Sequence, residues 1–137
     1  MKEDIMKGFH SDIEKDTVNN EDFRRVLYTG KHMQLVLMTL PPSGEIGLET
    51  HRENDQFFRF EAGEGRVVID DNEYAVKADD AVIVPAGARH NVINTSSETS
   101  LKLYTIYAPP HHKDGIVRAT REEAESNDEE FDGVTTE

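Results

Sequence analysis

The chain contains no cysteine among its 137 residues. This absence excludes disulfide frameworks, thiolate metal sites, iron–sulfur clusters and cysteine nucleophiles. A metal ion in this protein must therefore be bound by histidine, carboxylate, amide or water ligands.

Long hydrophobic runs are also lacking. The opening segment, MKEDIMKGFHSDIEKD, carries a charge every few positions and has no apolar stretch of the roughly 7 to 15 residues that mark a signal peptide. No other segment approaches the roughly 18 apolar residues of a membrane-spanning helix. From the sequence we expect a cytoplasmic protein without a membrane partner.

Positive charge is scarce and unevenly placed. Lys and Arg number 15 against 28 Asp and Glu, which gives a formal net charge of −13 and disfavours binding to nucleic acid. Residues 121–137 hold eight of the acids and one base, with almost no large apolar side chain. We predict a flexible N-terminal arm over residues 1–17, one folded domain over 18–120, and an acidic, disordered tail over 121–137.

The central region alternates apolar and polar residues in short runs separated by turn residues. This spacing is typical of an all-β sandwich or barrel. The predicted strands are Arg25 to Tyr28, His32 to Leu40, Gly47 to His51, Gln56 to Glu61, Gly65 to Ile69, Glu73 to Val76, Ala81 to Val84, His90 to Asn94 and Leu101 to Tyr107.

Ligand-type side chains occur on three of these predicted strands. Glu49 and His51 are two residues apart, so a strand projects both from one face. Gln56 opens the next apolar run, and His90 begins a later strand. We expect these side chains to meet inside the barrel as a three- or four-ligand metal site with open positions, as catalytic metals require.

Two motifs in this region resemble those of the cupin family. The first is GEIGLETHRENDQFFRFEAG over residues 44–63, and the second is DDAVIVPAGARHNVIN over residues 79–94. The second keeps Pro85, Gly87, His90 and Asn94 in register but has Asp79 in place of a glycine. The resemblance implies a single-domain cupin jelly-roll β-barrel, similar to the mannose-6-phosphate-isomerase-like cupins.

The same resemblance implies a metal site with an altered ligand set. Cupin sites usually hold three histidines and one glutamate, whereas the matching positions here are Glu49, His51, Gln56 and His90. One carboxylate still gives a ligand charge of −1, so we expect a divalent Mn, Fe, Co, Ni or Zn ion that keeps its Lewis acidity. The alternative is that these side chains only hydrogen-bond buried groups or water.

Aromatic side chains are candidates for the pocket wall. Phe58 and Phe60 share the face of Gln56, and either Tyr107 or Tyr104 points inward from the last long strand. The remaining histidines are expected to have no role in the site. His111 and His112 follow Ala108-Pro109-Pro110 in a predicted exposed loop, and His32 and His10 lie outside the motifs.

Three functions remain open from the sequence. The first is a metal-dependent enzyme acting on a small molecule, and the resemblance suggests a sugar (phosphate) isomerase or a dioxygenase. The absence of Lys and Arg from the predicted inward faces disfavours a phosphosugar. The second is a non-catalytic barrel that binds a small ligand, and the third is a structural barrel. Because His32 to Leu40 alternates apolar residues onto both faces, and cupins commonly pair through outer sheet faces, we also predict a homodimer.

Overall fold

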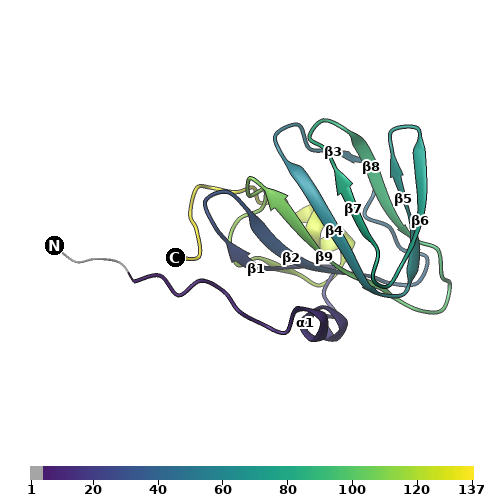
Figure 1. The fold of residues 1–137 in the computed structure, drawn as a ribbon, viewed down its shortest axis with the longest axis horizontal. Coiled ribbons are helices and arrows are strands. Elements are labelled where there is room, and N and C mark those ends of the chain that lie inside the picture. Colours follow the sequence, from purple (N-terminus) through teal and green to yellow (C-terminus); the bar gives the residue numbers. More distant parts are fainter. Residues whose placement is uncertain (1–4) are drawn as a thin grey trace.

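The computed structural model describes residues 5–137, which form two antiparallel sheets facing each other, with a short N-terminal helix lying outside the larger sheet (Figure 1). The larger sheet has the order β10-β1-β2-β9-β4-β7, and the smaller has the order β3-β8-β5-β6. The strands are β1 (Arg24–Thr29), β2 (Gln34–Leu40), β3 (Glu49–Thr50), β4 (Asp55–Ala62), β5 (Glu64–Ile69), β6 (Asn72–Lys77), β7 (Ala81–Val84), β8 (Arg89–Asn94), β9 (Leu101–Ala108) and β10 (Val117–Arg118). This arrangement confirms the prediction of an all-β jelly-roll barrel.

The core lies between the sheets and follows the period of two in the strands. In β9 every second side chain, from Leu101 to Tyr107, is buried. In β4 the buried residues are Gln56, Phe58 and Phe60, which makes Gln56 a polar member of an otherwise apolar inner face. Val67 on β5 and Val92 on β8 close the core from the other sheet.

The helix α1 (Ile13–Asn19) lies within and just beyond the segment that the sequence predicts as a flexible arm. Asp12 caps it by accepting a hydrogen bond from the Lys15 backbone N–H (3.2 Å). The loop after α1 covers part of the outer face of β2, where Leu37 is buried and the Thr39 hydroxyl donates to the Asn20 carbonyl (2.7 Å). The outer face of β2 is therefore less exposed to water than the apolar alternation in the sequence predicts.

The acidic segment 121–137 also follows a defined path in the structure, where composition predicts a disordered tail. It begins with α2 (Arg121–Ser126), capped by Thr120, and Ala124 is buried against the barrel. Beyond the helix, the Phe131 N–H donates to the His111 carbonyl (3.0 Å) and the Thr136 N–H to the Thr29 carbonyl (2.9 Å). Backbone hydrogen bonds hold this segment, so its shortage of apolar side chains does not prevent packing.

Neither described helix is long and apolar enough to cross a membrane.

Candidate metal centre and its pocket

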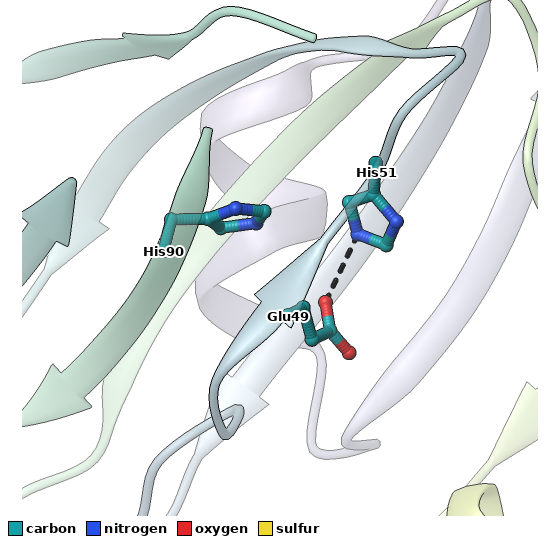
Figure 2. Close-up of side chains that lie close together, drawn as sticks. All are labelled: Glu49, His51 and His90. Carbon is teal, nitrogen blue, oxygen red and sulfur yellow. Dashed lines mark hydrogen bonds and ion pairs between the residues drawn. The ribbon is translucent and has the colours of Figure 1, made fainter. Parts of the chain in front are cut away.

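Three ligand-type side chains converge at the edge where β3 pairs with β8. Glu49 on β3 is the direct cross-strand partner of His90 on β8. His51 follows two residues after Glu49 and projects from the same side of the chain. One donor atom from each of the three side chains lies within 4.8 Å of the others, and Figure 2 shows them facing a common point.

Local hydrogen bonds orient the two imidazoles. The Nδ1–H of His90 donates to the Ala88 carbonyl (3.1 Å), which leaves Nε2 as the ligand nitrogen. The Nε2–H of His51 donates to the Glu49 carboxylate (3.0 Å; dashed in Figure 2). The Gly87 N–H donates to the His51 carbonyl (2.9 Å) and so ties the turn before β8 to the end of β3.

Gln56 reaches the barrel interior from the opposite sheet. It is 2% exposed, and its Nε2 donates to the Thr105 hydroxyl on β9 (3.0 Å). The other end of the amide, Oε1, is buried without a hydrogen-bond partner among the described residues. A buried, unpaired amide oxygen is costly. It therefore fits a neutral oxygen ligand to a cation better than a packing role.

Burial and nearby charge shift the pKa of Glu49 in opposite directions. Burial tends to raise the pKa of Glu49, but the hydrogen bond from His51 and electrostatic contributions that include the positive charge of Arg24 outweigh it, so the pKa lies below its ordinary value. Burial lowers the pKa of His90. A carboxylate beside a neutral imidazole is the protonation state that metal binding requires.

His111 and His112 lie beside the candidate metal ligands. This position corrects the prediction that the two side chains are solvated. The His111 ring centroid is 4.3 Å from that of His51, and the buried His112 Nε2 is hydrogen-bonded to the Tyr107 hydroxyl (3.2 Å). Burial, reinforced by the nearby charge of His51, lowers the pKa of His111 to about 4. Burial also holds the pKa of His112 well below its usual value. Both rings are therefore neutral at pH 7.

Gln34 on β2 holds this histidine pair in place. Its Oε1 accepts hydrogen bonds from the backbone N–H groups of His111 (3.2 Å) and His112 (3.0 Å). Its Nε2 donates to the His112 carbonyl (2.7 Å) and to the Thr29 hydroxyl (3.0 Å). A side chain with no exposed surface thus fixes the loop after β9 against the barrel.

A pocket of about 420 Å³ opens onto two of the three ligand-type residues, Glu49 and His51. Glu49, His51, His111 and His112 line one part of it, and residues of the acidic segment, among them Asp128, line another. The segment after Thr120 is therefore part of the pocket wall.

The predicted aromatic wall is placed as follows. The Tyr107 ring centroid lies 5.7 Å from that of His51, and the Phe58 ring 6.3 Å from that of His90. Phe60 stacks on Phe58 deeper in the core. Tyr104 lies on the other face of β9, beside Phe57. Of the two tyrosines considered, Tyr107 is the inward one.

Arg24 is a pocket residue that the sequence prediction missed. It begins β1, is 8% exposed and lines the same pocket as Glu49 and His51. This corrects the expectation that the inward faces carry no Lys or Arg. The period of two in the strand could have indicated it, because Arg24 lies two residues before the inward Val26. The predicted strand begins at Arg25, one residue too late, and so leaves Arg24 out.

Comparison with known proteins agrees with this architecture. Residues 36–107 match the family described as "Cupin domain". The chain is 46% identical over 124 residues to the uncharacterized protein YrkC of Bacillus subtilis, which covers 86% of this chain and 66% of YrkC. It is 38% identical over 112 residues to the uncharacterized protein L612 of Acanthamoeba polyphaga mimivirus, covering 80% and 70% of the two chains.

A solved structure supports the same assignment. The crystal structure of BH2720 from Bacillus halodurans superposes with a TM-score of 0.86 at 42% identity, covering 88% of this chain and 96% of that one. The motifs of residues 44–94, the two-sheet barrel and these matches lead to one conclusion: the chain belongs to the cupin family.

Proposed function

We propose that this cupin binds a divalent metal ion through Glu49, His51, His90 and the Oε1 atom of Gln56, and uses the site to bind or transform a small molecule in the adjoining pocket. The observation that carries this proposal is the convergence of the three donor atoms within 4.8 Å. The buried, unpaired Gln56 Oε1 supports a fourth ligand. A mixed oxygen and nitrogen set of this kind suits Mn, Fe, Co, Ni or Zn.

The charge of this ligand set favours a reactive site. With one carboxylate among four ligands, a divalent ion keeps a net charge near +1, so it supplies Lewis acidity toward a carbonyl or hydroxyl oxygen. Phe58 and Tyr107 are buried beside His90 and His51 and shield the inner side of the ligand group from water. The pocket on the outer side is lined largely by polar and charged side chains, which suits a small polar molecule.

Of the two reaction types considered, proton transfer has a specific residue in its favour. An isomerisation needs a proton acceptor beside the polarised substrate atom. His111 lines the pocket, and its ring centroid lies 4.3 Å from His51. We assign its neutral imidazole as the group that accepts the proton, and its lowered pKa makes it a weak base that returns the proton readily. Oxygenation is the alternative if the resident ion is redox-active, and binding without turnover is the alternative if neither activity is found.

Elemental analysis tests the metal assignment directly. The purified protein, equilibrated separately with Mn, Co, Ni and Zn and with Fe under anaerobic conditions, is expected to retain close to one ion per chain after gel filtration. The matched double variant H51A/H90A should retain none, while the variant H32A, which removes an exposed histidine, should behave as the wild type. A wild-type protein that stays empty with all five ions contradicts the proposal.

We also propose that the protein forms a homodimer through the outer face of the larger sheet. Leu35, Ile106, Phe57 and Ile83 are consecutive cross-strand partners on four strands, and Ile83 is 67% exposed. An apolar row of this length on an outer sheet face favours a second copy of the same chain as its cover. The proposed dimer therefore rests on this four-strand row and no longer on the apolar alternation of β2 alone.

Light scattering at micromolar concentration is expected to give twice the chain mass of 15.5 kDa for the wild type. I83K should give the single-chain mass, because a charge placed in the row must be desolvated on association. L48K alters an exposed apolar residue outside this row and should remain dimeric. A single-chain mass for the wild type would contradict the dimer.

A further inference from the structure

Arg24 is buried but has no acidic partner among the described residues, whereas several more exposed arginines are paired. Arg25, Arg59, Arg118 and Arg121 each lie within 3.2 Å of a carboxylate oxygen, although all are more exposed. Arg24 is 8% exposed, and the ion pairs formed within residues 5–137 do not include it. Its Nε is buried without a hydrogen-bond partner in this part of the chain.

A buried guanidinium without a carboxylate is energetically unfavourable unless something else satisfies it. The Phe23 ring, whose centroid is 5.4 Å from the Arg24 Cζ, offers a cation–π contact but no hydrogen-bond acceptor. Glu49 is close enough for the charge of Arg24 to contribute to its lowered pKa, yet it hydrogen-bonds to His51 instead. The guanidinium N–H groups of Arg24 are thus free to donate hydrogen bonds to a molecule that enters the pocket.

The pocket places this cation beside the candidate metal ligands. Arg24, Glu49, His51 and His111 all line the same space of about 420 Å³. We infer that Arg24 is a substrate-binding residue that holds the carboxylate of a small organic acid in this pocket. This inference rests on the proposed function, because it names the class of molecule that the metal site would act upon.

The charges around Arg24 favour a carboxylate over a phosphate. A guanidinium presents two parallel N–H groups that match the two oxygens of a carboxylate. Asp128 and Glu130 line the same pocket from the acidic segment, and Arg121 there is already paired with Glu125 (2.8 Å). Because several acids surround the single unpaired cation, a dianionic phosphate would be repelled more strongly than a monoanionic carboxylate.

The test compares acids with their uncharged amides. Metal-loaded protein is titrated by calorimetry with glycolate, lactate and benzoate, and separately with glycolamide, lactamide and benzamide. At least one acid is expected to bind the wild type more tightly than its amide. R24Q should reduce the affinity for that acid about tenfold and leave the affinity for its amide unchanged. R24K should bind the acid with an affinity between those of the wild type and R24Q. R25Q is the matched control, since Arg25 is the next residue of β1, is exposed and pairs with Asp22.

Three outcomes would overturn the inference. They are the absence of an acid preference in the wild type, an unchanged preference in R24Q, and inorganic phosphate binding more tightly than every acid in an Arg24-dependent way. Circular dichroism and metal content of each variant separate these outcomes from misfolding and from failure of the metal site. If the wild type holds no metal but the acid preference still depends on Arg24, the metal proposal fails and the role of Arg24 stands.

Discussion

Replacing His90 by alanine is expected to weaken divalent-metal binding by more than a hundredfold while leaving the barrel folded. His90 faces Glu49 across the β3–β8 pair, and its Nδ1–H is held by the Ala88 carbonyl, so the imidazole is fixed before any ion binds. Structural zinc sites with four ligands bind with about 10–16 kcal/mol, or roughly 3 kcal/mol for each ligand. A loss of that size corresponds to a factor of about 100 or more in Kd.

Competition with a fluorescent chelator measures this change for Zn and Co. The variant H32A is the matched control, because His32 is exposed and its loss removes an imidazole of the same intrinsic affinity. The free energy of unfolding of metal-free H90A should fall by no more than a few kcal/mol, as expected for a cavity at a buried site. An H90A protein that binds metal within threefold of the wild type would show that the three side chains do not form the site.

Most of the fold could be predicted because short apolar runs are separated by turn residues and because long strands such as β4 and β9 alternate buried and less buried residues. Each of the nine predicted strands overlaps an observed one, and the long pair β2 and β9 runs in register from Gln34 opposite Tyr107 to Leu40 opposite Leu101. The short β10 was missed, since two residues carry no periodic signal. Its pairing with β1 depends on the chain returning to the barrel edge after the loop, which is a tertiary event.

The candidate metal ligands were predictable for the same reason. Glu49 and His51 share a face because they are two apart, and His90 lies opposite Glu49 because the second motif places it at the start of β8. The environment of Gln56 was not predictable in detail. Its hydrogen bond to Thr105 joins β4 to β9, and only the sheet order makes those strands neighbours.

The residues that sequence reasoning placed wrongly are those whose burial depends on distant segments. His112 follows two prolines and reads as part of an exposed loop, yet the acidic segment and Gln34 enclose it. The acidic segment itself lacks apolar periodicity and packs through backbone hydrogen bonds, which composition does not reveal. The candidate metal ligands are therefore indicated by local motifs, whereas the pocket wall is assembled from long-range contacts.

Replacing Gln34 by methionine is expected to destabilise the protein by about 3 kcal/mol. Methionine keeps the length and shape of the side chain, so little cavity is created. Four hydrogen bonds are lost, and the His111 and His112 N–H groups, the His112 carbonyl and the Thr29 hydroxyl lose a partner. An unsatisfied buried group costs roughly 1–3 kcal/mol, and the partly exposed His111 regains water. Chemical denaturation of the metal-free variant measures the loss.

The effect of Gln34 should also reach the pocket, because three of these four hydrogen bonds fix the backbone of the two histidines beside it. In Q34M the His111 and His112 backbone amides should exchange with solvent much faster, while amides of β4 and β5 retain their protection relative to global stability. M33L is the matched control, since Met33 is the exposed neighbour and its conservative change should alter stability by less than about 0.5 kcal/mol. Equal stabilities for Q34M and M33L would show that the loop is held by packing rather than by Gln34. A large loss confined to Q34M, with faster exchange at His111 and His112, would show that one buried amide on β2 maintains the pocket wall.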